Sequence, residues 1–492
     1  MNYIGISSGF HDAAVSVIDD TGNILFAGHS ERYSKNKHDK DICEGLLYDA
    51  FQHTNSASLQ YHYYERPWLK SLRQLRSGEG FLWPTWEKLL GSTYNQMGKP
   101  KIHTHSHHLS HAAAGFQTSA YDDATVVVID AIGEFDTISI WNAWYDKNGV
   151  AKYKKLWGQR YPDSIGLFYS AMTQRVGLRP LDEEYILMGM AAYGKSKPVD
   201  KMSTELIESY KDITFRDNLH TGVSDTFLEG VDEIDIAHSA QLIAEQLIMN
   251  VISKAKMLGG SKNLVYGGGV ALNCLANRLL GDYYDNIWIM PNPGDAGSSL
   301  GAACLGYGKR VNWTNAFLGH DISGVYPANH VIDCLLTDKI VGVASGRAEF
   351  GPRALGHRSL LADPRGQEIK DKVNEIKRRQ KFRPFAPIIL EEYADTYFDM
   401  PNGFDNSRYM QVIARCRLPD LFPAIVHHDG TSRVQTVPND GSGIRQLLEK
   451  WYILTGCPML LNTSLNIRGE PMVNERADAD RFEKLYNITV LS

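Results

Sequence analysis

Short apolar runs separated by turn residues recur along the first part of the chain. Residues 3–6, 13–19 and 24–28 form three of them, with Ser-Ser-Gly after the first. Such runs, bounded by small or polar residues, predict buried strands. The arrangement returns at residues 126–129, a β-branched run, and at residues 133–141, a further turn and strand. Two strand–turn–strand units in one chain predict a duplicated fold.

Helical periodicity occurs after these strands. Residues 236–258 are predicted to form a long amphipathic helix, and residues 164–171 begin a shorter one. A strand at residues 263–266 runs into three glycines, and a strand at residues 287–290 runs into Pro-Asn-Pro-Gly. Because strands and helices alternate, the chain is predicted to be an α/β protein. Gly, Pro, Ser and His recur near residues 318–329, which places a domain boundary there.

Composition narrows the class of protein. The net charge of −6 gives no global footprint for nucleic acid, although it does not exclude a local basic groove. No apolar run approaches the roughly 20 residues of a membrane span, and the N-terminus opens on a strand pattern without a signal peptide. The six cysteines lie far apart and form no CxxC pair, which indicates reduced thiols. We therefore expect a cytoplasmic protein that does not contact a membrane.

Two histidines four residues apart carry the first candidate site. His107 and His111 leave the same face of a predicted helix. Asp130 follows the β-branched strand, at the end where α/β sheets place their chemistry. Two neutral imidazoles and a carboxylate form a good ligand set for a divalent metal. The alternative is a chance spacing among 17 histidines; for Asp295, which follows a strand, the alternatives are a helix cap and a metal carboxylate.

Three turns are candidates for contact with a ligand. His11-Asp12 lies in a small-residue turn between the first two strands, where backbone N–H groups can approach phosphate oxygens. Lys37 lies in residues 31–39, whose simplest interpretation is a charged surface loop. The third turn, a weak signal alone, predicts a phosphate- or adenosine-approach loop and comprises Gly267, Gly268, Gly269 and then Asn273.

Residues 61–86 combine aromatic and basic side chains. Such a surface could stack on an acceptor ring or on a base. The interpretation we favour is a core segment whose helix carries Lys70 and Arg73 outward.

Arginines recur between glycines in the second unit. They occur in residues 346–359, near residue 383, at residue 433 and in residues 462–471. Arginine binds phosphate through two parallel N–H groups, and neighbouring glycines let the backbone donate as well. The pattern favours a polyanion pocket of nucleotide size over a set of surface arginines paired with carboxylates.

Four long motifs occur in order in the second unit. They are FGPRALGxRS from residue 350, FRPFAP from residue 382, SRVQTV from residue 432 and NTSxNxRGEP from residue 462. With these motifs the chain resembles, over nearly its whole length, the O-carbamoyltransferases of the nodulation-protein, cephamycin and tobramycin type. The resemblance implies a duplicated actin-like domain in residues 1–325, similar to the threonylcarbamoyl transferases, and a YrdC-like α/β domain in residues 326–492.

The resemblance also implies a two-step reaction. ATP and carbamoyl phosphate would form carbamoyl adenylate and pyrophosphate in the YrdC-like domain, and the actin-like domain would transfer the carbamoyl group to an acceptor hydroxyl. The implied cofactors are a divalent metal, iron(II), and magnesium(II) with ATP. The acceptor would be a sugar or natural product, or hydroxymethylcytosine in DNA, and the oligomeric state is left open.

Roles are implied residue by residue. The base facing the acceptor hydroxyl would be His11, with Lys37 as its neighbour. The metal ligands would be His107, His111, Asp130 and Asp295. The nucleotide would be approached by Gly267, Gly268, Gly269, Asn273, Arg353 and Arg358, and carbamoyl phosphate would be held by Lys377, Arg383, Arg433 and Ser464.

Two other functions compete with this one. A non-enzymatic nucleotide-binding switch with an actin-like core would bind ATP without releasing pyrophosphate. A metallohydrolase using the same histidines would turn over with metal alone. The complete histidine–aspartate set and the arginines of the second unit favour the carbamoyltransferase.

Overall fold

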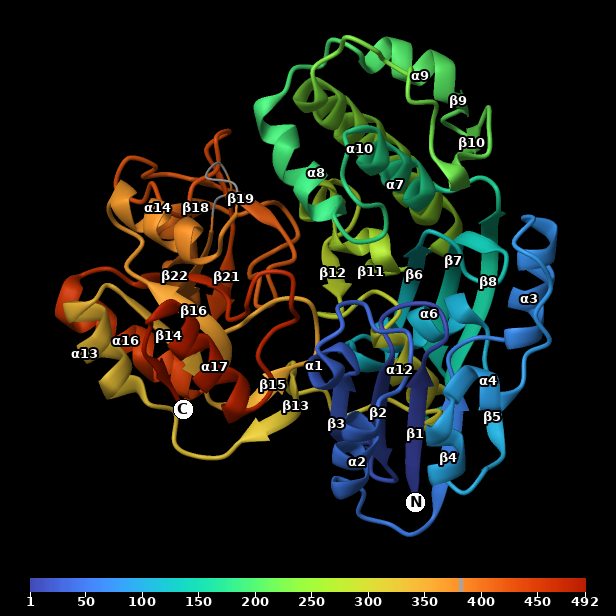
Figure 1. Cartoon of the computed structure of the whole chain (residues 1–492). Helices are drawn as coiled ribbons and strands as arrows, with labels where there is room; N and C mark the ends of the chain where they lie inside the picture. Colours follow the sequence, from blue (N-terminus) through green and yellow to red (C-terminus); the bar gives the residue numbers. More distant parts are fainter. Residues whose placement is uncertain (380–382, 384) are drawn as a thin grey trace.

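The computed structural model describes residues 1–379, 383 and 385–492. Phe382 and Pro384 of the FRPFAP motif lie outside the described residues. The chain folds into a larger N-terminal unit with two five-stranded sheets and a C-terminal unit around a six-stranded sheet, which lie side by side (Figure 1).

The first sheet of the N-terminal unit has the strand order β3-β2-β1-β4-β5. Its first three strands are antiparallel neighbours, whereas β4 is parallel to β1 and β5 is parallel to β4. The apolar runs at residues 3–6, 13–19 and 24–28, which predict strands, lie in β1, β2 and β3. The strands are β1 (Asn2–Ser7), β2 (Ala14–Asp19), β3 (Ile24–His29), β4 (Leu59–Tyr63) and β5 (Ile102–Thr104).

The second sheet repeats the first. Its order is β8-β7-β6-β11-β12, with three antiparallel neighbours followed by two parallel strands. The same order and directions in two sheets confirm the predicted duplication and the predicted α/β class. The strands are β6 (Asp123–Ile129), β7 (Asp136–Tyr145), β8 (Ala151–Arg160), β11 (Asn263–Gly267) and β12 (Asn286–Ile289).

Two close-packed helices lie at the centre of the N-terminal unit, α6 (His107–Thr118) and α12 (Gly297–Tyr307). A Cβ atom on Gly301 would lie 1.8 Å from the Ser110 carbonyl oxygen, so only glycine permits this approach. Helix α12 also contacts β1, β2 and β4, so it joins the first sheet to α6. This packing sets the distance between the two histidines on α6 and Asp295, which lies two residues before α12.

The outer helices of the N-terminal unit cover the remaining faces of its sheets. The predicted long helix is α10 (Glu233–Gly259), which packs against α7 (Ile165–Arg175), α8 (Glu184–Met190) and α9 (Val199–Leu206) (Figure 1). The other elements are short: α1 (Glu31–Ser34), α2 (Glu44–Gln52), α3 (Pro67–Arg76), α4 (Trp86–Leu90), α5 (Ser92–Gln96), α11 (Cys274–Asn277) and the hairpin of β9 (Ile207–Ser209) and β10 (Thr214–Phe215).

Helix α3 corrects one prediction. Its cations point inward: Lys70 pairs with the buried Glu65, and Arg73 is 3% exposed and pairs with Glu79. Trp68 and Leu75 instead are more than half exposed. The inward cations are tolerated because each has a carboxylate partner, which offsets the cost of burying its charge.

The C-terminal unit is built on a mixed sheet with helices on both faces. Helices α13 (Ala328–Thr337) and α16 (Gly443–Thr455) pack with one face, and α14 (Gln367–Ile376) and α17 (Arg476–Tyr486) with the other. The sheet order is β21 (Gln435–Val437), β17 (Ala386–Leu390), β22 (Met459–Ser464), β16 (Arg358–Ala362), β14 (Ile340–Ala344) and β23 (Val490–Leu491). A smaller sheet with α15 (Ala394–Tyr397) beside it joins β18 (Phe398–Asp399), β19 (Ile413–Cys416) and β20 (Thr431–Arg433).

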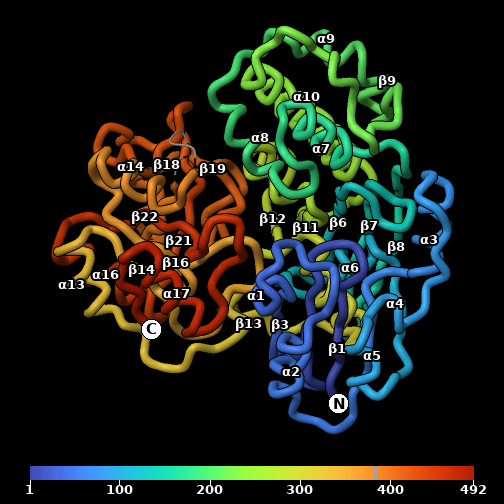
Figure 2. Tube along the Cα trace, in the orientation of Figure 1, coloured from blue at the N-terminus to red at the C-terminus, as the bar shows by residue number. Residues whose placement is uncertain are grey.

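The two units meet along α1, as the Cα trace in Figure 2 shows. Lys35 pairs with Asp478 at the start of α17, and Arg32 donates to the Gly351 carbonyl at 2.7 Å. The ribbon of β13 (Phe317–Ile322) and β15 (Gly346–Glu349) connects the units near the predicted boundary at residues 325 and 326, which stays a prediction. Among the described residues, no helix has both the length and the apolarity that crossing a bilayer requires.

Replacing Gly301 by alanine tests the packing of α6 against α12. Gly301→Ala should lower the free energy of unfolding by about 1 to 3 kcal/mol, because the new methyl group forces the two helices apart. Gly189→Ala in α8 is the matched control, since a Cβ there meets nothing within 4 Å. Urea unfolding midpoints measure both, and an unchanged midpoint for Gly301→Ala would contradict the close packing.

Candidate functional site

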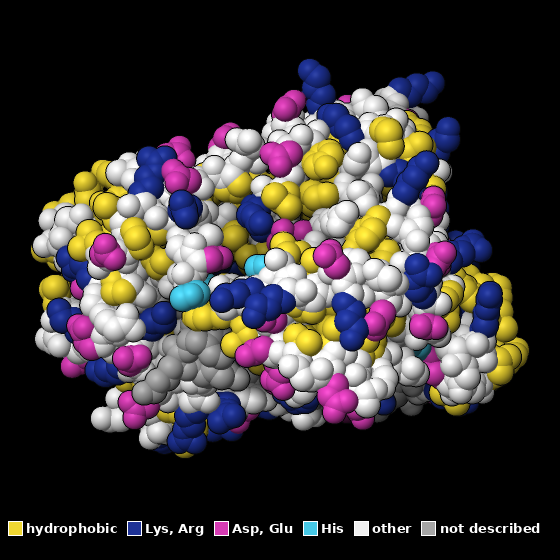
Figure 3. All heavy atoms as spheres, turned by 90° about the horizontal axis from the view of Figure 1, so that it is seen from above, with side chains coloured by type: hydrophobic (Ala, Val, Ile, Leu, Met, Phe, Trp, Pro, Cys, Tyr) yellow, Lys and Arg dark blue, Asp and Glu magenta, His cyan; other side chains and the backbone are white. Residues whose placement is uncertain are grey.

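A large cavity opens between the two units. Its volume is about 840 Å³, and residues of both units line it. Seen from above, the surface is hollowed between the two lobes, with basic and histidine side chains around the hollow (Figure 3). Candidates from every part of the sequence lie on its wall, namely His11, Lys37, Asp130, Gly269, Asn273, Asp295, Arg353, Lys377, Arg383, Arg433 and Ser464.

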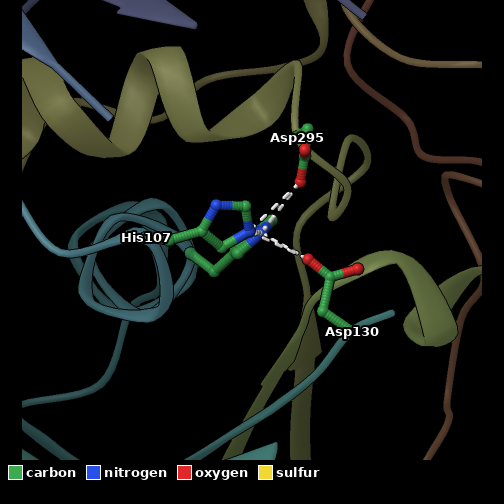
Figure 4. A group of neighbouring side chains, drawn as sticks. His107, Asp130 and Asp295 are labelled. Carbon is green, nitrogen blue, oxygen red and sulfur yellow. Dashed lines mark hydrogen bonds and ion pairs between the residues drawn. The ribbon is translucent and has the colours of Figure 1, made fainter. Parts of the chain in front are cut away.

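Four buried ligand atoms converge at the end of the cavity that the N-terminal unit forms (Figure 4). The Nε2 atoms of His107 and His111 lie 3.1 Å apart on successive turns of α6. Each lies 3.0 to 3.2 Å from Asp130 Oδ2 and 3.3 Å from Asp295 Oδ1. Asp130 directly follows β6, as predicted. Asp295 lies beside the histidines, which favours the metal carboxylate over the helix cap.

The spacing and chemistry of these atoms fit a divalent metal. Ligand atoms 3.0 to 3.3 Å apart surround a centre with bonds of about 2.0 to 2.2 Å, the length of metal bonds to imidazole and carboxylate. Burial disfavours charge on His107, but the carboxylates of Asp295 and Asp130 outweigh burial and raise its pKa well above the ordinary value. The same carboxylates raise the pKa of His111. The two carboxylates therefore stabilise positive charge at this point. Protons on the imidazoles carry that charge without metal, and a metal ion can carry it instead.

Neighbouring groups contact two of the four ligands, His111 and Asp130. The Ser298 hydroxyl lies 3.0 Å from His111 Nδ1. Asp130 Oδ1 accepts the backbone N–H of Ala131 at 2.8 Å and that of Gly269 at 3.3 Å. Such contacts fix the orientation of metal ligands. Only Gly269 of the three predicted glycines lines the cavity, and Gly268 instead lets its backbone approach Ile129.

His11 lies next to this group. Its Nε2 is 3.7 Å from Asp295 Oδ2, and its Nδ1 donates to Asp12 Oδ2 at 2.9 Å. Burial alone would lower the pKa of this imidazole. The carboxylates of Asp295 and Asp12 have the larger combined effect and raise the pKa to about 9. Lys37 also faces the cavity and pairs with Asp182 at 2.5 Å.

A cluster of cations forms the end of the cavity that belongs to the C-terminal unit. Arg353, Lys377, Arg383 and Arg433 line it, and among the described residues no carboxylate forms an ion pair with any of them. Burial, with Arg433 nearby, lowers the pKa of Arg353 to about 9. Burial and two neighbouring arginines lower the pKa of Lys377 well below its usual range. Cations held so close together without anions form a site for a polyanion.

Arg358 corrects the prediction for the nucleotide site. It is fully buried and does not line the cavity. Its five N–H groups donate to backbone carbonyls of the C-terminal unit and of its connecting ribbon, including Asn474, Gly346 and His320. No donor is left for a phosphate, so Arg358 stabilises the fold.

The sequence pattern assigns no role to His38 or Asp182 on the cavity wall, and it includes Asp12 only as part of the His11-Asp12 turn. The stretch with His38 was interpreted as a charged surface loop, but His38 donates to Asp12 at 2.8 Å and to Asp182 at 3.0 Å. No spacing in the sequence relates these residues, because Asp182 is 144 positions from His38.

Comparison with known proteins identifies the family to which this chain belongs. A model of the carbamoyltransferase N-terminus matches residues 50–304, and a model of the carbamoyltransferase C-terminus matches residues 332–492. The chain therefore belongs to the carbamoyltransferase family and is a transferase. This excludes a purely non-enzymatic switch as the description of the chain.

Relatives span most of the chain. Protein sll1178 of Synechocystis sp. is 33% identical over 97% of this chain and 93% of its own length. Nodulation protein NolNO of Sinorhizobium fredii is 29% identical over 95% and 76%, and nodulation protein NolO of Bradyrhizobium diazoefficiens is 31% identical over 76% and 75%.

Solved structures give a weaker likeness. HypF of T. kodakarensis is 14% identical with a TM-score of 0.37, over 62% of this chain and 47% of that one. Component A of the Acidaminococcus fermentans (R)-2-hydroxyglutaryl-CoA dehydratase is 15% identical with a TM-score of 0.34, over 62% and 98%.

Metal binding to the His107 group should release protons near neutral pH. The raised pKa values keep protons on the imidazoles without metal, and a metal needs their neutral nitrogens. Affinity should therefore rise with pH. Titration calorimetry with zinc(II) in buffers of different ionisation enthalpy counts the protons. His107→Ala should lose the binding, whereas the exposed His103→Ala should retain it; equal binding by both variants would disprove the site.

Proposed function

We propose that the chain is an ATP-dependent O-carbamoyltransferase that forms carbamoyl adenylate and passes its carbamoyl group to an acceptor hydroxyl. One observation carries the proposal. One cavity has a buried group of two histidines and two aspartates at one end, and at the other it has cations that form no ion pair with a carboxylate in the part of the chain that the structure describes. A metallohydrolase would need only the first of these ends.

The cationic end suits the formation of the adenylate. Arg353, Arg383 and Arg433 would hold phosphates of ATP and carbamoyl phosphate, and their mutual repulsion falls when polyanions bind. Lys377 donates to the Ser464 carbonyl at 2.7 Å, which places both beside the bound carbamoyl phosphate in this proposal. In this proposal water cleaves carbamoyl phosphate to carbamate and phosphate, and a carbamate oxygen then attacks the α-phosphorus of ATP, so that carbamoyl adenylate forms and pyrophosphate leaves. Magnesium(II) would accompany ATP.

The other end suits the transfer. His107, His111, Asp130 and Asp295 would hold a divalent metal, iron(II) by resemblance, and this ion would act as a Lewis acid toward the carbamoyl carbonyl. His11 would accept the proton of the acceptor hydroxyl while its oxygen attacks the carbamoyl carbon and AMP leaves. The carboxylate charges that raise the pKa of His11 would be offset by a cation between Asp130 and Asp295, which favours the neutral imidazole that a base requires.

The continuity of the cavity supports transfer without release of the intermediate. Residues of both ends line one continuous cavity of about 840 Å³. Carbamoyl adenylate is a mixed anhydride, and a passage inside the protein limits its exposure to water. Gly269 and Asn273 also line the cavity, where they would approach the adenosine.

The acceptor carries a hydroxyl group in this proposal, on a sugar or natural product or on hydroxymethylcytosine in DNA. The overall charge of −6 does not favour a polyanionic acceptor. An acceptor in DNA would bind with an affinity that falls steeply with salt.

Two variants should separate the half-reactions. Arg433→Ala should abolish pyrophosphate release from ATP and carbamoyl phosphate, because it removes a cation from the adenylate-forming end. His107→Ala should retain pyrophosphate release and lose transfer, because it removes a metal ligand at the other end. Arg417→Ala, which removes an exposed arginine paired with Asp399, is the control. Equal loss of both steps in both variants would overturn the assignment of the two ends.

A mass-spectrometric screen should identify the acceptor. The protein with ATP, magnesium(II), carbamoyl phosphate and iron(II) is offered sugars, aminoglycosides, nucleosides and DNA containing hydroxymethylcytosine. We expect a gain of about 43 Da, a carbamoyl group in place of hydrogen, on one class. If DNA gains the mass, transfer should weaken as salt rises. Absence of both mass gain and ATP turnover would contradict the proposed function.

A further inference from the structure

A continuous chain of hydrogen bonds runs along the cavity wall behind His11. His11 Nδ1 donates to Asp12 Oδ2 at 2.9 Å, and His38 Nδ1 donates to Asp12 Oδ1 at 2.8 Å. His38 Nε2 in turn donates to Asp182 Oδ1 at 3.0 Å. The three partners come from the turn after β1, the loop after α1 and the loop between α7 and α8, so distant segments meet at one imidazole.

We propose that Asp12, His38 and Asp182 are positioning residues that hold the His11 imidazole with its Nε2 toward Asp295. The inference rests on the proposed role of His11 as the base of carbamoyl transfer. Asp12 acts directly on the ring, His38 fixes Asp12, and Asp182 fixes His38. Groups that orient a base in this way set the geometry of the attack, which loses rate steeply when it is displaced.

The backbone supports a dedicated array. Asp12 has φ of +53° and His38 has φ of +55°, a left-handed conformation that costs energy for residues other than glycine. Each strained residue directs its side chain into the chain of hydrogen bonds. The carboxylate of Glu31 also accepts the backbone N–H of His38 at 3.0 Å, which secures the strained turn.

Asp182 joins the array to the cationic end of the cavity. Arg179 holds its second oxygen at 2.8 Å, and Lys37 holds its first. Three residues further on, Tyr185 places its ring 5.1 Å from the Arg383 guanidinium. The segment from Asp182 to Tyr185 therefore contacts the groups that face carbamoyl phosphate and the groups that orient His11.

The same atoms could instead form an ion-binding site. Ligand atoms of Asp12, Glu31 and His38 lie within 4.8 Å of one another and could share an ion. Both ring nitrogens of His38 are already engaged as donors, so an ion there would have to break the chain. The two interpretations give opposite results below.

The test observes the His11 ring directly and needs no acceptor. Full-length protein is labelled with ¹⁵N-histidine and loaded with zinc(II) as a diamagnetic ion, and the His11 imidazole signal is identified by its loss in His11→Asn. Asp12→Asn and Asp182→Asn should shift or broaden this signal, because the ring loses its fixed orientation. Asp182→Glu, which keeps the carboxylate, should restore part of it.

Asp49→Asn is the matched control. Asp49 accepts from His320 at 2.8 Å outside the cavity, and its 15% exposure equals that of Asp182. This variant should leave the His11 signal unchanged, and cooperative thermal unfolding of every variant excludes misfolding. A His11 signal that is identical in Asp182→Asn and wild type would overturn the proposal. A second zinc ion per chain that His38→Ala removes would overturn it as well.

Pyrophosphate release from ATP and carbamoyl phosphate separates this inference from the proposed function. Asp182→Asn should change that rate by less than about two-fold, because the array acts on the second step. Loss of pyrophosphate release in Asp182→Asn alone would assign Asp182 to the first step and overturn the proposal. Absence of release in the wild type would refute the proposed function, while the His11 signal still decides the positioning.

Discussion

The structure depends on the burial of two histidines and two aspartates in one contact. His107, His111, Asp130 and Asp295 are each less than 10% exposed, and burying four ionisable groups costs free energy unless they compensate one another. Imidazoles from α6 face carboxylates from the end of β6 and from the residues before α12, and each donor lies about 3 Å from its acceptor. The glycine-mediated approach of α6 and α12 serves this geometry, because a wider separation would leave Asp295 without its partners.

The opposite end of the cavity is a cluster of cations that repel one another. Arg353, Lys377, Arg383 and Arg433 lie together, and no described carboxylate forms an ion pair with any of them. Burial, with Arg433 nearby, lowers the pKa of Arg353 to about 9. A folded protein tolerates such a cluster where a bound anion stabilises it. The same unit contains Arg358, which shows the contrast: it is fully buried, whereas Arg353, Arg383 and Arg433 are half-buried, and backbone carbonyls satisfy all its N–H groups. Arg353 and Arg358 belong to the same motif, but their different surroundings give them different roles.

Much of the fold could be predicted from apolar runs, because strand burial leaves a local pattern. The strands at residues 3–6, 14–19 and 126–129, the long helix and the duplication all follow from such patterns. Helix α3 could not be predicted correctly, because its inward-facing Arg73 depends on Glu79 as a partner, and its outward-facing Trp68 contradicts the usual pattern. The family motifs located the cavity arginines Arg353, Arg383 and Arg433 but could not distinguish Arg353 from Arg358, which does not line the cavity.

The sequence by itself determined the elements, the paired histidines on one helical face and the family, because helical periodicity and long motifs are local properties of the chain. Only the tertiary structure decided which charges meet. His38 belongs to the site because two residues, Asp12 and Asp182, reach its two ring nitrogens from different segments. Asp295 joins the histidines only because α12 packs on α6. Electrostatic interactions depend on distance in space and on local burial, and neither quantity can be predicted from the spacing of residues along the chain.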